Sequence, residues 1–269
     1  DITLHQWLDI LETLAKDKPF IASRILTNAK QLLKWGVKRQ LLDLNYLADI
    51  QAKEDLQVKK VAGSRALTDE EIQWVWLAID ESRMAPRNKL FVKLCLIYGC
   101  RNGELRLAKK DHFDFETRIW IVPSQNHKMG RMTKKAIVRP IIDKIEPLIN
   151  ELISMSGDSY YLMPSDDINQ PLTANFGLSL PYGIMQWLRK HQNIELPHFS
   201  LHDLRRTART NFSTLTQPHI AEIMLGHSLG GVWQVYDQHD YLKEQSLAYE
   251  AWCERLFSLV GDGTHKPFI

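Results

Sequence analysis

The chain has 269 residues, of which 44% are hydrophobic and 25% are charged, as in a soluble globular protein and unlike a disordered or fibrous one. This length suffices for one or two domains with a hydrophobic core. The longest apolar stretches, such as Leu94–Tyr98, are far shorter than the roughly 20 residues that span a bilayer, so neither a transmembrane helix nor a signal peptide is expected. Because the sequence begins at Asp1 and not at Met, we expect it to be part of a longer protein.

The cysteines and the charges narrow the class further. Cys95, Cys100 and Cys253 are odd in number and form no Cys-x-x-Cys pair, which argues against a disulfide framework or a zinc finger and indicates reduced, buried thiols. The 34 basic and 32 acidic residues give a net charge of only +2. Their distribution is uneven, because residues 125–140 hold five cations and no carboxylate: Lys128, Arg131, Lys134, Lys135 and Arg139. This basic patch favours nucleic acid as a partner.

The first 66 residues are predicted to hold two helices and a linker. Leucine and tryptophan recur at helical spacing from Leu4 to Leu14. A second helix follows Pro19, and Gly36 is its predicted stop. Charged residues dominate Gln51–Ala66, and this segment is predicted to be a linker.

The rest of the chain is predicted to be mainly helical. Thr68-Asp69-Glu70-Glu71 is typical of a capping box that opens a helix, and Pro86 begins another helix that ends near Gly99. Three short strands are predicted within residues 113–115, 119–122 and 136–138, with Lys128–Lys134 as the loop of the last hairpin. Helices are then expected up to about residue 260, with a break at Ser156–Asn175. The predicted fold class is mainly α with a small antiparallel β-sheet.

Four clusters of residues are candidates for chemistry. Arg101 follows a glycine turn, and Glu104 three residues later can hold it rigid, although taken alone this is an ordinary helix-start ion pair. His202 and Arg205 share one helix face and can bind one phosphate together, or form a surface patch. Lys128 alone is a solvated lysine of a hairpin.

The fourth cluster is Leu225-Gly226-His227, which Tyr236 follows nine residues after the histidine. A histidine beside a glycine is more often a helix cap than a catalyst. The order and spacing of the four clusters together are more informative than any one of them.

This set resembles the tyrosine recombinases, the phage-integrase family. In chain order, the family pattern is T/Y-G-x-R-x-x-E-L, a lysine in a hairpin, H-x-x-R, L-G-H and a tyrosine. In the same order, the matching residues here are Tyr98-Gly99-Cys100-Arg101 with Glu104-Leu105, Lys128, His202 with Arg205, Leu225-Gly226-His227, and Tyr236. Three further segments resemble prophage and genomic-island integrases of enteric bacteria: Trp120-Ile121-Val122-Pro123, His202-Asp203-Leu204-Arg205-Arg206-Thr207 and Asp240-Tyr241-Leu242. The resemblance covers about residues 67–256.

The resemblance implies a domain organisation and partners. Residues 1–60 would be the C-terminal part of a helical, DNA-binding core-binding domain, with a linker to residue 66, a catalytic domain over 67–260 and a tail over 261–269. An arm-binding domain and the start of the core-binding domain would be missing. The expected partner is double-stranded DNA, bound by a tetramer on paired sites, with DNA-bending accessory proteins as further candidates. The expected location is the cytoplasm of a bacterial host, at the nucleoid and not at a membrane.

The resemblance also implies the reaction, in which DNA is cleaved and rejoined through a 3′-phosphotyrosine without ATP. The implied catalytic residues are Arg101, Lys128, His202, Arg205, His227 and Tyr236. Tyr236 would be the nucleophile, the two arginines would stabilise charge on the phosphate, and His202 would accept the tyrosine proton. His227 would bind the phosphate. Lys128 would protonate the leaving oxygen, with Lys134 and Lys135 as the alternatives.

The remaining implied residues act around this centre. Glu104 would orient Arg101, and contacts to the DNA backbone are expected from Arg131, Lys134, Lys135, Arg206 and Arg209. No Asp/Glu cluster of metal-ligand type is apparent, and no metal ion or other cofactor is expected.

Three alternative functions stay open: a chromosome-dimer resolvase, a type IB topoisomerase-like nicking–closing enzyme, and an inactive DNA-binding relative. The segments at His202 and Asp240 favour an integrase, and the presence of both Lys128 and Tyr236 argues against an inactive relative. A second tyrosine, Tyr241, lies five residues beyond Tyr236, which on a helix is a rotation of about 140°. We therefore predict a packing or interface role for Tyr241.

Overall fold

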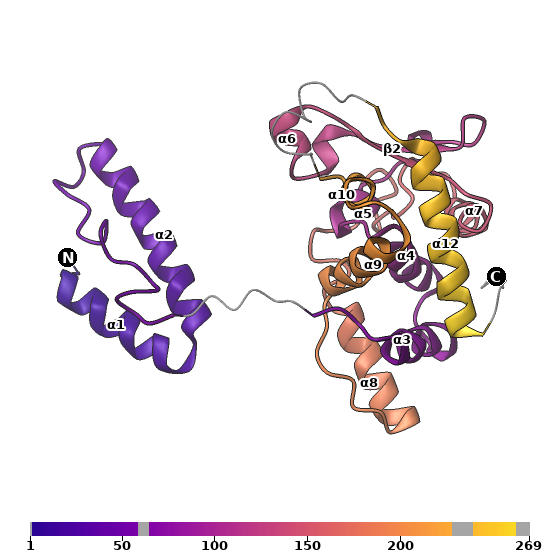
Figure 1. The fold of residues 1–269 in the computed structure, drawn as a ribbon. Helices are drawn as coiled ribbons and strands as arrows, with labels where there is room; N and C mark the ends of the chain where they lie inside the picture. Colours follow the sequence, from indigo (N-terminus) through magenta and orange to yellow (C-terminus); the bar gives the residue numbers. More distant parts are fainter. Residues whose placement is uncertain (1, 59–64, 228–238, 262–269) are drawn as a thin grey trace. The chain divides into compact units, whose positions relative to one another are not determined.

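The computed structural model describes residues 2–58, 65–227 and 239–261, and the chain divides into two compact units, residues 1–63 and 64–269 (Figure 1). Each unit has its own hydrophobic core. The helices and the single small antiparallel sheet of the described residues confirm the predicted fold class. Within these ranges no helix is both long and apolar enough to cross a membrane.

The N-terminal unit is a pair of helices with a long loop packed against them. Helix α1 (Leu4–Asp17) begins at a capping box on Thr3, and α2 (Pro19–Lys38) begins at its proline, as predicted. The core of the unit consists of buried apolar side chains from both helices and from the loop: Leu11, Leu26, Ala29, Leu47, Leu56 and Val58.

Two predictions for the N-terminal unit are wrong. Gly36 does not end α2, which continues to Lys38; a Cβ at Gly36 would lie 2.8 Å from Leu42 Cδ1, so the glycine serves the close approach of the returning chain. The predicted linker also begins too early, because Leu56 and Val58 are buried in the core. Charged neighbours in the sequence hide these two apolar contacts.

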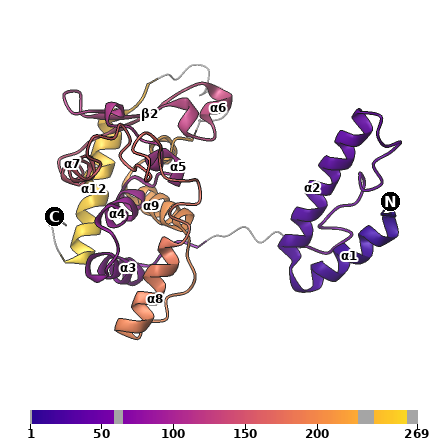
Figure 2. The ribbon, with the colours of Figure 1, turned by 180° about the vertical axis from the view of Figure 1, so that it is seen from behind.

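The C-terminal unit is built around helix α4 (Pro86–Tyr98). All residues from Lys89 to Tyr98 are buried, because the helix is apolar on almost every face and other helices cover it. Figures 1 and 2 show α4 and α9 (Leu201–Leu215) inside the unit and the long helix α12 (Leu242–Val260) along one side of it. Its further helices include α3 (Asp69–Glu81), α5 (Asn102–Arg106), α7 (Glu146–Met155), α8 (Leu180–Gln192) and α10 (Pro218–Met224).

The local start and stop signals of this unit are confirmed. Thr68 accepts a hydrogen bond from the Glu71 N–H, and the Glu71 carboxylate accepts one from the Thr68 N–H, which caps α3. Pro86 is the first residue of α4, and Gly99 ends it in the left-handed conformation, with φ of 59°. The three cysteines are free and buried, as predicted.

The sheet has the order β1-β2-β3, with all pairs antiparallel. Its strands are β1 (Phe113–Asp114), β2 (Ile119–Val122) and β3 (Ile137–Pro140), close to the predicted segments. The short 3-10 helix η1 (Lys110–His112) precedes β1. The predicted loop Lys128–Lys134 contains a further short helix, α6 (Gly130–Thr133), and the 3-10 helix η2 (Ser124–Asn126) precedes it. The buried His127 ring ties this segment together, because it bonds to the backbone of Gly130 at the start of α6 and of Lys135 just after its end.

Candidate active site

The turn at Gly99, which precedes Arg101, lies against helix α9. Gly99 has a positive φ, and its carbonyl accepts a hydrogen bond of 2.8 Å from Arg205 Nη1. A Cβ at Gly99 would lie 2.9 Å from Leu225 Cδ2 and 3.1 Å from Ala208 Cβ. Glycine is therefore required for both the backbone conformation and the space, and Arg101 follows two residues later as the N-cap of α5.

We expect Gly99→Ala to lower the free energy of unfolding of the C-terminal unit by more than the roughly 1–3 kcal/mol of a strained left-handed backbone alone. The excess comes from the overlap with Leu225 and Ala208. Urea unfolding measures the change. Gly157→Ala is the matched control, since Gly157 has φ of 54° but no atom within 4 Å of its would-be Cβ. Equal losses in the two variants would contradict the packing argument.

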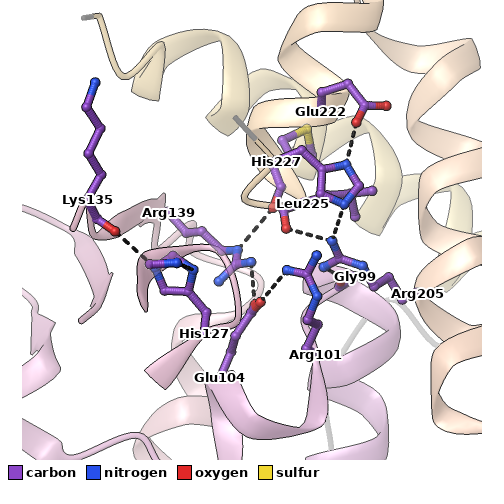
Figure 3. Close-up of polar contacts among 12 residues, drawn as sticks. Gly99, Arg101, Glu104, His127, Lys135, Arg139, Arg205, Glu222, Leu225 and His227 are labelled. Atoms are coloured by element: carbon purple, nitrogen blue, oxygen red, sulfur yellow. Dashed lines mark hydrogen bonds and ion pairs between the residues drawn. The ribbon is translucent and has the colours of Figure 1, made fainter. Parts of the chain in front are cut away.

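Glu104 lies between two arginines (Figure 3). Its carboxylate binds Arg101 Nη1 at 3.0 Å, the ion pair that the sequence indicated, and Arg139 Nη2 at 2.7 Å. Burial alone would raise the pKa of Glu104, but Arg139, Arg205 and Arg101 hold it below its ordinary value. Glu104 is thus an ionised carboxylate that fixes two guanidinium groups.

Arg139, one of the five cations that the sequence analysis grouped into a basic patch, does not lie at the surface. Its side chain is fully buried, with the guanidinium carbon 5.0 Å from the centroid of the Trp120 ring, and its Nε donates to the Met224 carbonyl at 3.1 Å. Burial opposes its charge, yet Glu104 holds its pKa above the ordinary value. The signal was present in the sequence, because Arg139 follows Ile137 by two residues in a strand and therefore faces the same side of the sheet.

Arg205 comes from α9, which begins at Ser200 with a capping box formed with Asp203. Its guanidinium donates to the carbonyls of Gly99 and Leu225, both at 2.8 Å, and is only 3% exposed. Burial, followed by the charge of Arg101, lowers the pKa of Arg205 to about 10, which leaves it charged at neutral pH. The side chain is therefore a fixed cation between three segments of the chain.

His227 joins this cluster through the end of α10. Gly226, with φ of 70°, reverses the chain so that the His227 N–H donates to the Glu222 carbonyl at 3.0 Å. Nε2 of the ring lies 2.9 Å from Arg205 Nη2, and Nδ1 contacts the Glu222 carboxylate (Figure 3). The sequence analysis missed Glu222. Residues five positions apart are not neighbours on a helix, and Glu222 and His227 meet only because the chain turns at Gly226.

His202 lies on α9, three residues before Arg205, and its side chain is exposed. Desolvation by the surrounding protein, followed by the charges of Arg206 and Arg205, lowers its pKa below 6.5. The imidazole is therefore neutral at pH 7 and can accept a proton.

The hairpin that carries Lys128 is anchored beside the arginines. His127 is buried; its Nδ1 accepts from the Gly130 N–H at 3.0 Å, and its Nε2 lies 3.0 Å from the Lys135 carbonyl. Figure 3 shows the His127 ring close to Glu104 and the Lys135 side chain pointing away from the arginines. Lys128 itself is exposed, and the described contacts do not join its side chain to either Arg101 or Arg205. His127, which the sequence analysis missed, thus holds the base of the hairpin.

The residues predicted to contact DNA differ in their exposure and in their ion-pair partners. Lys134 and Lys135 are exposed, whereas Arg206 is paired with Asp203 at 2.5 Å and Arg209 with Glu222 at 2.7 Å. For Arg131 the structure describes the backbone within α6.

Of the two tyrosines weighed as nucleophile, the structure describes Tyr241. Tyr236, the predicted nucleophile, lies outside the described residues. Tyr241 is at the start of α12 with φ of 53° and packs on the core, its ring 5.5 Å from that of His219 and 4.7 Å from that of His239. This environment agrees with a packing role for Tyr241.

The described part of the site is suited to bind an anion. Three guanidinium groups surround one carboxylate, and Arg101 stays partly exposed, with 27% of its side chain accessible. Guanidinium groups match phosphate oxygens in charge and geometry. In the described part of the chain no three His, Cys, Asp or Glu side chains are grouped as metal ligands would be.

A model of the phage integrase family matches residues 65–243, a range that contains all the residues of this site. The chain belongs to the phage integrase family. Within this family, it is 25% identical over 172 residues to the integrase of Enterobacteria phage P4, covering 61% of this chain and 39% of that protein. It is 22% identical over 272 aligned positions to the prophage integrase IntZ of Escherichia coli strain K12, covering 98% of this chain and 62% of that protein. The chain therefore spans less than two thirds of either relative.

Solved integrase structures share its fold. The Tn1549 transposon integrase, in complex with circular intermediate DNA, matches with a TM-score of 0.63 and 16% identity over 93% of this chain and 85% of that one. A lambda integrase tetramer bound to a Holliday junction matches with a TM-score of 0.62 and 17% identity over 87% of this chain and 66% of that one.

Proposed function

We propose that this chain is the catalytic part of a site-specific DNA recombinase, an integrase that cleaves and rejoins double-stranded DNA through a 3′-phosphotyrosine. The observation that carries the proposal is the convergence of Arg101, Arg205 and His227 at the Gly99 turn, inside the range matched by the integrase family. The similar proteins support the choice of integrase, since two are named integrases and others were solved with DNA.

In the proposed reaction the Tyr236 oxygen attacks the scissile phosphorus. A bond forms between that oxygen and phosphorus, the bond to the 5′-oxygen breaks, and a 5′-hydroxyl is released. The 5′-hydroxyl of a partner strand then attacks the phosphotyrosine and frees Tyr236. Each step exchanges one phosphodiester for another, so no ATP is consumed.

The arginines would stabilise the transition state. Charge develops on the non-bridging oxygens, and fixed guanidinium groups in a buried site oppose it without reorganisation. Arg205 is held by two backbone carbonyls and Arg101 by Glu104, so both cations are oriented before the DNA arrives.

His202 would take the proton of Tyr236. A phenol has a pKa near 10 and becomes a strong nucleophile only when it loses its proton. The lowered pKa of His202 keeps its imidazole neutral and ready to accept that proton at pH 7.

Lys128 would donate the proton to the leaving 5′-oxygen. We expect Lys128→Ala to leave DNA binding nearly intact and to slow cleavage strongly. A substrate with sulfur in place of the leaving 5′-oxygen restores the rate, because a thiolate leaves without a proton. Lys134→Ala and Lys135→Ala are the matched controls from the same hairpin. Rescue by sulfur in one of these variants, and not in Lys128→Ala, would assign the acid to that lysine.

The proposal extends to the domains and the assembly. The N-terminal helical unit would be the C-terminal part of a core-binding domain and would contact DNA, and residues 67–260 would be the catalytic domain. Four copies would act on paired DNA sites, with DNA-bending proteins as accessory factors. We place the protein in the bacterial cytoplasm, at the nucleoid.

A nicked half-site DNA tests the proposal. The nick lies near the cleavage position, so the released strand diffuses away and the covalent protein–DNA adduct accumulates. An inactive DNA-binding relative would bind this DNA and form no adduct. Supercoiled plasmid without a recombination site separates a topoisomerase, which relaxes it, from the proposed recombinase, which does not.

A further inference from the structure

Glu222 stands outside the residues to which the family resemblance assigns a role, yet it contacts two of the predicted site residues. Its carboxylate binds Arg209 Nε at 2.8 Å and Nη2 at 2.7 Å, and it contacts His227 Nδ1. Burial alone would raise the pKa of Glu222, but hydrogen bonds from His227 and Arg209 hold it below its ordinary value. Near neutral pH the carboxylate is therefore ionised and can only accept hydrogen bonds.

The contacts of the His227 ring determine which of its nitrogens carries the proton. Nδ1 faces a carboxylate that only accepts, so Nδ1 must donate. Nε2 faces a guanidinium that only donates, at 2.9 Å, so Nε2 must present its lone pair. Both neighbours select the same neutral form of the ring, with the proton on Nδ1.

This ring form connects Glu222 to Arg205. The Arg205 guanidinium donates to two backbone carbonyls and to His227 Nε2, so the imidazole is one of three acceptors that fix its plane. With the proton on Nε2 instead, two N–H groups would face each other, and the guanidinium would have to turn.

We propose that Glu222 is a positioning residue of the integrase site: it holds His227 in the Nδ1–H form, so that Nε2 accepts from Arg205 and keeps that guanidinium oriented toward the phosphate. The effect of Glu222 on catalysis rests on the proposed function. The position of the proton on the His227 ring, by contrast, is a property of the protein without DNA.

The ring form is measured by NMR of the protein labelled with ¹⁵N in its ten histidines, with the His227 signals assigned by their loss in His227→Gln. We expect the Nδ1–H form in the unmodified protein and a shift toward Nε2–H in Glu222→Leu. Arg209→Met, which removes the other partner of Glu222, should keep the Nδ1–H form. A ring form that is the same in Glu222→Leu as in the unmodified protein would overturn the proposal.

The consequence for catalysis is measured as the single-turnover cleavage rate on the nicked half-site at saturating DNA. We expect Glu222→Leu to slow cleavage by about 10- to 100-fold, by analogy with the loss seen when the hydrogen-bonded partner of a metal-binding histidine is removed. Glu195→Leu is the matched control, because it removes an exposed ion pair with Arg189. It should leave the rate unchanged.

A double-mutant cycle separates positioning from a general loss of structure. If Glu222 acts through His227, then Glu222→Leu adds little to the loss already caused by His227→Gln. Losses that multiply in the double variant would overturn the proposal. Absence of any adduct with the unmodified protein, together with the expected NMR result, would reject the recombinase function and leave the assignment of the His227 ring form supported.

Discussion

Replacement of Glu104 by leucine is expected to lower the free energy of unfolding of the C-terminal unit by about 3–5 kcal/mol, the usual cost of removing one partner of a buried ion pair. Glu104 and Arg139 are both fully buried and 2.7 Å apart, so the variant leaves the Arg139 charge without a counterion. Arg101 loses its partner as well, and we expect cleavage to be abolished.

Two further variants test this explanation by urea unfolding. Glu104→Leu combined with Arg139→Met should be more stable than Glu104→Leu alone, because an apolar pair replaces an unpaired buried charge. Glu254→Leu, which breaks an exposed ion pair with Lys144, should change the free energy of unfolding by at most about 1 kcal/mol. A loss as small in Glu104→Leu as in Glu254→Leu would contradict the buried-pair argument.

The same ion pair predicts a dependence on pH. The pKa of Glu104 is lower in the folded protein than its ordinary value of 4.5. Its stabilising contribution is thus fully present above pH 4.5 and is lost as the pH falls through the lower, folded value. The unmodified protein should lose stability in this acidic window more steeply than Glu104→Leu does.

Replacement of Tyr236 by phenylalanine is expected to abolish the covalent DNA adduct, since phenylalanine has no oxygen with which to attack phosphorus. The affinity for DNA should stay within a few-fold of that of the unmodified protein, because the arginines and lysines of the site are unchanged. Tyr241→Phe is the matched control, with the same atom removed from a residue that packs on the core at the start of α12. It should still form the adduct, and loss of the adduct in Tyr241→Phe alone would reverse the assignment.

Local signals explain why much of the fold was predictable. Helix ends are marked by residues that act on neighbours only a few positions away. The start of α3 at Thr68 with Glu71, and the start and end of α4 at Pro86 and Gly99, are all confirmed. The strands around Trp120 follow from alternation and aromatic content in the same way. The order of the site motifs, which led to the family, is also a property of the sequence alone.

The features that were missed depend on contacts between distant segments. The strand alternation with Ile137 indicates which face the Arg139 side chain takes, but not that Glu104, 35 positions away, lies there to neutralise its buried charge. Glu222 reaches His227 only because Gly226 reverses the chain. Gly36 and Leu56 were misassigned for the same reason, since close packing in the N-terminal unit determines their roles.

The central claim is that Tyr236 becomes covalently joined to DNA at the site formed by Arg101, Arg205 and His227. Its most direct test is to trap the adduct on a nicked half-site, digest the protein and identify the tyrosine that carries the nucleotide by mass spectrometry. The account predicts the nucleotide on Tyr236. A nucleotide on Tyr241, or DNA that is bound but never joined to the protein, would contradict it.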